Sequence, residues 1–196
     1  MTVSRAPFDC STRKYAFIDG ENLRHIFDQQ HPTLKDRRDA YVENYVRVVT
    51  ILAKEMGVQG PYAAMYARLY RAYYYDAPLG DDHADHERQR VVLDRIEATT
   101  GFHVRPGTAR RRKGSRVEQK EVDVLLAVDM LSHAYRGNMH VALLISNDLD
   151  FRPAIEECTR HGIYVVLGGN SDTPAELRSS ADEFYDISAV VNRPPS

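Results

Sequence analysis

The sequence contains no tryptophan and only two cysteines, Cys10 and Cys158, which lie far apart and in no metal-ligand spacing. It therefore implies neither a disulfide framework nor a cysteine metal site, which fits a reducing cytoplasm. We find no signal peptide and no apolar run long enough to cross a bilayer, so we expect a cytoplasmic protein without a membrane span. The formal net charge is -2 over 196 residues. Any contact with nucleic acid must therefore come from a local basic patch.

Short apolar segments alternate with segments of helical periodicity along most of the chain. We expect strands at 14–18, 62–75, 102–104, 141–145, 163–167 and 184–187. We expect helices at 41–56, 91–101, 118–135 and 174–181, and another that Pro153 opens. This alternation predicts a three-layer α/β/α sandwich on a mostly parallel sheet. With no internal repeat and no linker, we assign one domain to 14–190, an N-terminal arm to 1–13 and a C-terminal tail to 191–196.

The chain is organised around the apolar run 141–145, which ends abruptly in Ser146-Asn147-Asp148-Leu149-Asp150. In open α/β sheets ligands bind just beyond the carboxyl ends of the strands. Two carboxylates one residue apart form a concentrated negative site there, which is costly unless a cation neutralises it. The alternative is that Asp148 or Ser146 only caps the following helix.

The first expected strand has the same form, because residues 14–18 run into Asp19-Gly20-Glu21-Asn22. Gly20 permits a tight turn, and we expect Asn22 to cap the helix that follows. Asp19 also has an alternative interpretation as a cap or turn residue. A second strand that ends in an acid favours a functional role.

The helix expected at 118–135 supplies a third acid. Lys120 and Asp123 are three residues apart, on one side of its first turn. Asp129 shares the apolar face of this helix, where a carboxylate must be paired, capped or coordinated. We take Asp123 as a ligand candidate and assign Asp129 a structural role.

A strongly basic run, 105–116, precedes that helix. Such clusters supply the electrostatic part of nucleic-acid binding, although a solvated hairpin would have the same composition. The predicted substrate-binding residues are Arg110, Arg111, Arg112, Lys113 and Arg116. By contrast, we interpret the acidic loop 76–82, with His83 and His86 nearby, as a solvated loop rather than a metal site.

Asp19, Asp123, Asp148 and Asp150 are predicted to meet at one edge of the sheet. Four acids without a cysteine or histidine ligand favour Mg²⁺ or Mn²⁺ over zinc. A cation held in this way can lower the pKa of a bound water and stabilise the charge that develops on a phosphodiester.

Three further polar residues complete the predicted catalytic set. We expect Asn22 and Ser146 to orient a ligand carboxylate or the attacking water. Lys120 is expected to neutralise charge near the scissile phosphate. No Ser-His-Asp arrangement, cysteine nucleophile or glycine-rich phosphate loop competes with this interpretation.

Segments 17–22, 120–123 and 146–151, with Asp129, resemble the three ordered motifs of the NYN domain, a family within the PIN-like nucleases. Segments 162–166 and 177–184 resemble the closing part of that domain. The resemblance implies a PIN-like, Rossmann-like fold and metal-dependent endonucleolytic cleavage, usually of RNA. It also implies that the metal-binding acids are Asp19, Asp123, Asp148 and Asp150. The family commonly has glycine at position 121, where this chain has glutamate.

We therefore predict a metal-dependent endoribonuclease that acts on single-stranded RNA. The alternative is a catalytically silent PIN-like module that binds RNA or serves as an adaptor. A phosphatase-like or receiver-like phosphotransfer domain fits less well, because residues 19–21 do not supply the paired acids that those classes place after the first strand. The sequence leaves open a homodimer and a regulatory protein partner.

Overall fold

The computed structural model of the protein describes residues 12–56, 69–107 and 120–192. Six strands within these residues form one sheet in the order β3-β2-β1-β4-β5-β6. Every pair of neighbouring strands is parallel. The strands are β1 (Lys14–Asp19), β2 (Leu69–Asp76), β3 (Phe102–Pro106), β4 (Val141–Ile145), β5 (Tyr164–Gly169) and β6 (Glu183–Asp186).

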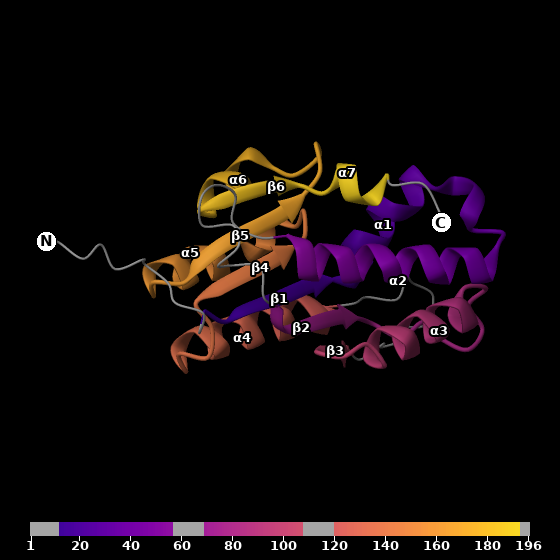
Figure 1. Ribbon diagram of the computed structural model, residues 1–196, viewed down its shortest axis with the longest axis horizontal. Coiled ribbons are helices and arrows are strands. Elements are labelled where there is room, and N and C mark those ends of the chain that lie inside the picture. The colour runs from indigo at the N-terminus through magenta and orange to yellow at the C-terminus, as the bar shows by residue number, and fades with distance from the viewer. Residues whose placement is uncertain (1–11, 57–68, 108–119, 193–196) are drawn as a thin grey trace, which may run out of the picture.

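Helices cover both faces of this sheet (Figure 1). The first face carries α1 (Gly20–Gln30), α2 (Arg38–Glu55), α3 (His86–Glu97) and α7 (Ser188–Val191). The second carries α4 (Lys120–Tyr135), α5 (Arg152–Arg160) and α6 (Ala175–Ser180). Short 3-10 helices, η1 (Pro32–Leu34) and η3 (Leu149–Phe151), follow α1 and β4. The predicted three-layer α/β/α sandwich is confirmed. None of the helices in the described residues is long and apolar enough to cross a membrane.

The strands β1 and β4 lie at the centre of the sheet, and all their residues are buried. This explains why both read as continuous apolar runs rather than as alternating ones. From β1 the chain proceeds outward to β2 and β3, and it then returns to place β4 on the other side of β1. The carboxyl ends of β1 and β4, where Ile18 pairs with Ile145, therefore form the topological switch point.

The turn from β1 into α1 is immediate. Asp19 caps α1, because its carboxylate accepts a hydrogen bond from the backbone N–H of Asn22 at 3.1 Å. The expectation that Asn22 is the cap was therefore wrong. Gly20 is required here because a Cβ at this position would lie 2.6 Å from the ring of Tyr74.

Several boundaries differ from those expected. Of the strand predicted at 62–75, the part after residue 68 is β2, and residues 62–68 lie outside the described residues. Val191, assigned to the tail, is fully buried as the last residue of α7, so the packed domain extends at least to this residue. Asp76 is also fully buried, whereas Asp81 and Asp82 are exposed as a solvated loop requires.

Candidate active site

An open cleft of about 490 Å³ lies at the switch point, beyond the carboxyl ends of β1 and β4. Its lining residues come from the end of β1, from one side of α1, from the first turn of α4 and from the loop after β4. They are Asp19, Glu21, Asn22, Arg24, His25, Asp28, Asp123 and Asp148. Three of the four predicted metal ligands thus line one cavity, although they are distant in the sequence.

Hydrogen bonds fix the floor of this cleft. The Ser146 hydroxyl donates to Oδ2 of Asp19 at 2.8 Å and accepts from the backbone N–H of Asp148 at 3.0 Å. The backbone N–H of Asn147 donates to Oδ1 of Asn22 at 3.2 Å, which ties the loop after β4 to the start of α1. Ser146 is fully buried, so its hydroxyl sets the orientation of Asp19.

The electrostatics of the cleft disfavour ionised carboxylates. Burial, together with the neighbouring Asp123 and Glu21, raises the pKa of Asp19 to about 7, against the opposing effect of its hydrogen bonds from Asn22 and Ser146. Burial also raises the pKa of Asp123, with added repulsion from Asp148, Glu21 and Asp150. A cation in the cleft would relieve both effects.

The donor set suits a hard divalent cation, because the carboxylates that line the cleft offer oxygen. As the side chains lie, no three His, Cys, Asp or Glu residues of the described part of the chain are grouped closely enough to hold a metal ion. Asp123 and Asp148 are only partly buried, whereas Asp19 is fixed. Coordination by all three acids therefore requires the side chains of Asp123 and Asp148 to turn toward Asp19.

The other predicted residues lie elsewhere. Asp150 is exposed and does not line the cleft, and its backbone N–H donates to Oδ1 of Asp148 at 2.9 Å, which caps η3. Asp148 is thus both a helix cap and a cleft residue. Lys120 is the first residue of α4, and its side chain is not described. The predicted substrate-binding residues, 110–113 and 116, lie outside the described residues.

Besides Asn22, helix α1 contributes four cleft residues to which no role was assigned from the sequence. Glu21, Arg24, His25 and Asp28 line the cleft from one face of this helix. In the sequence, pairs of these residues are three or four positions apart. That spacing places them on one face of a helix and could have identified them. Arg24 makes a bidentate ion pair with the buried Asp76, which is why that carboxylate is tolerated at zero exposure.

Asp129 has the structural role expected from its place on the apolar face of α4. Its carboxylate accepts a hydrogen bond from the Tyr75 hydroxyl at 3.1 Å and another from Nε of Arg105 at 3.0 Å. These contacts join α4 to β2 and β3 beside the cleft.

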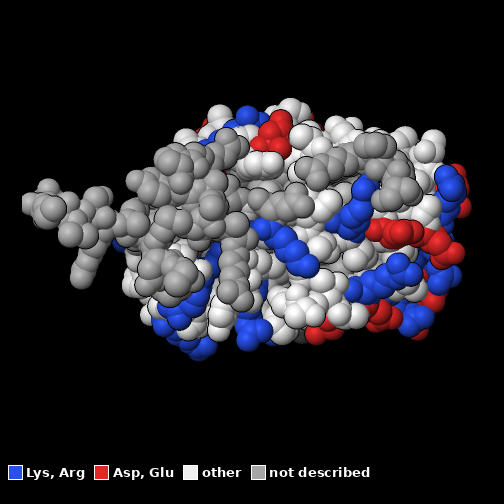
Figure 2. All heavy atoms as spheres, viewed as in Figure 1, with Lys and Arg blue, Asp and Glu red and all other residues white. Residues whose placement is uncertain are grey.

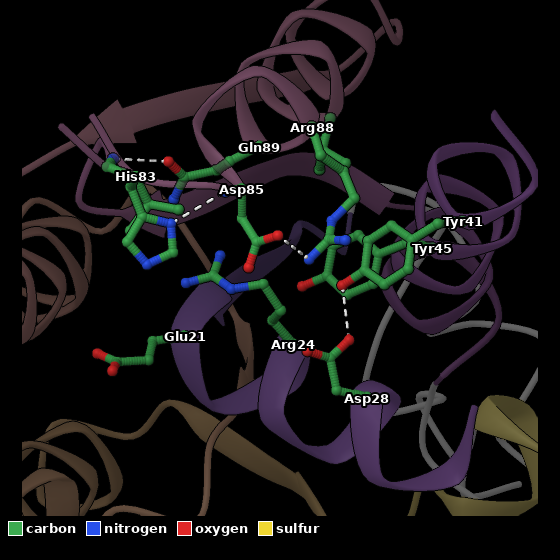
Figure 3. A pocket seen from close by; sticks show the side chains of 11 residues that line it. Glu21, Arg24, Asp28, Tyr41, Tyr45, His83, Asp85, Arg88 and Gln89 are labelled. Carbon is green, nitrogen blue, oxygen red and sulfur yellow. Dashed lines mark hydrogen bonds and ion pairs between the residues drawn. The ribbon is translucent and has the colours of Figure 1, made fainter. Parts of the chain in front are cut away.

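A smaller cavity of about 220 Å³, drawn in Figure 3, shares lining residues of α1 with the cleft. Glu21, Arg24 and Asp28 line both cavities. Figure 3 shows two of its polar contacts, in which Arg88 pairs with Asp85 at 2.8 Å and the hydroxyl of Tyr41 donates to Asp28 at 2.8 Å.

The fold and the cleft together define an α/β/α domain with acidic residues gathered at its switch point. Residues 14–188 match the model of the NYN domain, so the chain belongs to the NYN domain family. The resemblance inferred from the motifs is confirmed, and the family indicates a nuclease-like fold. A crystal structure of a protein of unknown function from Vibrio parahaemolyticus is similar, with a TM-score of 0.60 and 16% identity over 93% of this chain and 96% of that chain. No curated protein matches the chain.

Proposed function

We propose that the chain is a metal-dependent endoribonuclease that hydrolyses phosphodiester bonds of single-stranded RNA in the acidic cleft. The observation that carries the proposal is that Asp19, Asp123 and Asp148, which come from three separate elements, line one open cavity at the switch point. Membership of the NYN domain family supports a nuclease.

In this proposal Asp19 is the fixed ligand and Asp123 and Asp148 are the adjustable ones. Ser146 keeps Asp19 oriented, since its hydroxyl donates to that carboxylate from a fully buried position. Asp150 joins them by a change of side-chain rotamer or acts on them through its charge. When bound, Mg²⁺ or Mn²⁺ would supply an acidified water and offset the charge that develops on the phosphate.

The chain's polar groups then position the substrate. Asn22 lies in the cleft with its Oδ1 engaged by the Asn147 backbone, so its amide N–H₂ is the group left to contact water or phosphate. Lys120, at the start of α4, is proposed to offset charge near the scissile phosphate. The basic run before it is proposed to hold the RNA backbone through phosphate contacts.

The test is cleavage of 5′-labelled single-stranded RNA by the wild type, Asp148→Asn and the control Asp94→Asn, each with Mn²⁺, with Mg²⁺ and with EDTA. Asp94 is a matched control because it is an exposed aspartate on α3, outside the cleft. We expect metal-dependent cleavage by the wild type and the control. Asp148→Asn should be slower by about 100-fold or more, since several kcal/mol of charge stabilisation are lost. Equal cleavage by Asp148→Asn and the wild type would refute the proposal.

The second candidate is a catalytically silent module that binds RNA or serves as an adaptor. It is favoured by the absence, among the described residues, of three side chains grouped to hold a metal ion. It predicts RNA binding that is independent of metal, no cleavage, and no increase in melting temperature when Mn²⁺ is added. The nuclease predicts such an increase, because an ion that binds only the folded state stabilises it.

A further inference from the structure

A row of five rings lies on the second face of the sheet, on the strands beside α4. The ring centroid of Tyr73 is 5.2 Å from that of His133, 5.6 Å from that of His103 and 6.3 Å from that of Tyr15. Tyr15 is in turn stacked on Tyr70, with centroids 5.6 Å apart. We call these five residues the ring row. It crosses β3, β2 and β1 and reaches the last turn of α4.

The ring row stays partly open because α4 packs mainly over β1 and β2 rather than over β3. Helix α4 packs against β1 and β2, whereas α3, the helix that packs against β3, lies on the opposite face. In the described part of the chain this face of β3 meets α4 through the pair of Arg105 with Asp129, and His103 on the same face is only partly buried. Tyr70 is 54% exposed, and Tyr73, His103 and His133 are partly exposed. A packed aromatic core would hide these four rings. The fifth ring of the row, Tyr15, is buried at 5% exposure.

Arginines border the ring row. Arg71 donates to Nε2 of His103 at 2.8 Å, and its guanidinium lies 5.7 Å from the centre of the Tyr70 ring. Burial lowers the pKa of His133, and the charges near it include those of Asp129, Arg136, Arg105 and Arg71. Three positive charges against one negative make this border basic in a protein of net charge -2. Figure 2, drawn in the same view as Figure 1, shows basic side chains at the lower left of the described surface and both signs mixed at its right-hand end.

The ring row is connected to the acidic cleft by α4. This helix begins near the cleft, where Asp123 lies, and runs toward the ring row, where His133 lies. Asp123 and His133 are ten residues apart along the helix, which is about 15 Å at 1.5 Å per residue. Arg105, paired with Asp129 at 3.0 Å, stands between the two sites. A chain of nucleotides could thus follow α4 from one site to the other.

We propose that the ring row and its arginines form a binding platform for the bases of single-stranded RNA on one side of the cleavage site. Exposed aromatic faces stack on unpaired bases whatever their sequence, and arginines contact the phosphates and the rings. Bases within a duplex are not free to stack in this way, so the platform selects single strands. The direction of the RNA toward the cleft rests on the proposed nuclease function, whereas the binding itself does not.

The test is fluorescence anisotropy with a labelled single-stranded RNA of about 12 nucleotides, within the usual range of such sites. The full chain is used in EDTA, so that no metal-dependent cleavage occurs. Tyr70→Ala removes an exposed ring, and Tyr70→Phe restores it. Tyr135→Ala is the matched control, because Tyr135 is 56% exposed on α4 and lies outside the ring row.

We expect Tyr70→Ala to weaken binding by about 5- to 100-fold, the range for one base–aromatic stack, with Tyr70→Phe and Tyr135→Ala close to the wild type. Arg71→Gln should reduce the slope of log affinity against log salt concentration by about one, because one phosphate contact is lost. A duplex of the same sequence should bind more weakly than the single strand. Unchanged affinity in Tyr70→Ala, or equal loss in Tyr70→Phe, would overturn the platform.

Cleavage of a dinucleotide with Mn²⁺ separates this inference from the proposed function. Such a substrate is too short to span from the cleft to Tyr70, so its cleavage by the wild type tests the nuclease without the platform. Binding that depends on Tyr70 in a protein that cuts nothing would support the platform and refute the nuclease. Cleavage that needs Asp148, with binding independent of Tyr70, would do the reverse.

Discussion

Replacement of Asp19 by asparagine should stabilise the metal-free protein at neutral and alkaline pH. Burial is the largest cause that raises the pKa of Asp19 from an ordinary value of 3.8 to about 7. A tenfold change in a protonation equilibrium is about 1.4 kcal/mol, so the ionised carboxylate destabilises the fold by ~4 kcal/mol at most. Asparagine keeps an oxygen for the N–H of Asn22 but has to rearrange the hydrogen bond with Ser146, at a cost of about 1–2 kcal/mol. The net gain should be about 2 kcal/mol.

The difference in stability between Asp19→Asn and the wild type should depend on pH. The pKa of Asp19 in the folded state lies above its value in the unfolded state. The corresponding stability is therefore fully present below about pH 4 and is lost as the pH rises through 7. Asp19→Asn lacks this titration, so its advantage should be absent near pH 4 and complete near pH 8.

Thermal unfolding in EDTA from pH 4 to 9 measures both proteins. At pH 8 the variant should melt about 4–8 °C above the wild type, since 1 kcal/mol shifts the melting temperature of a domain of this size by about 2–4 °C. Saturating Mn²⁺ should raise the melting temperature of the wild type and leave that of the variant nearly unchanged. If the variant melts at or below the wild type at pH 8 without metal, the argument from burial is wrong.

Two predictions concern the support of the cleft. Asp76→Ala leaves the guanidinium of Arg24 without its bidentate partner, so we expect a loss of about 3–5 kcal/mol of unfolding free energy in urea titrations; a loss below 1 kcal/mol would contradict the importance of this ion pair. Gly20→Ala forces a Cβ to within 2.6 Å of the Tyr74 ring, which should cost about 1–3 kcal/mol by the same measurement. Unchanged stability in this variant would show that α1 can shift freely at its first residue.

The central part of the fold follows from sequence patterns that depend only on neighbouring residues. The apolar runs of β1 and β4 indicate buried parallel strands, and each is followed at once by polar residues. Because the carboxyl ends of parallel strands lie at one edge, the approach of Asp19 to Ser146 and Asp148 could be predicted without coordinates. The role of Asp129 could also be predicted, since a carboxylate on an apolar helical face needs a partner.

Other features depend on contacts between distant segments. The partner of Arg24 is Asp76, 52 residues later, and neither position shows in the sequence that the other lies beside it. The burial of Val191 likewise depends on α7 packing beside α1 and α2. A short C-terminal segment that contains two prolines gives no local signal of such packing.

The sequence alone determined that Asp19 and Asp148 lie at one edge of the sheet. The period of the strands and the position of their last residues place both acids at the carboxyl ends of neighbouring strands. The ring row was decided only by the tertiary structure, because Tyr15, Tyr73, His103 and His133 come from four elements that sheet order and the position of α4 bring together. Periodicity specifies which face of its own strand or helix a side chain occupies. Which other side chains share that surface depends on how the elements pack.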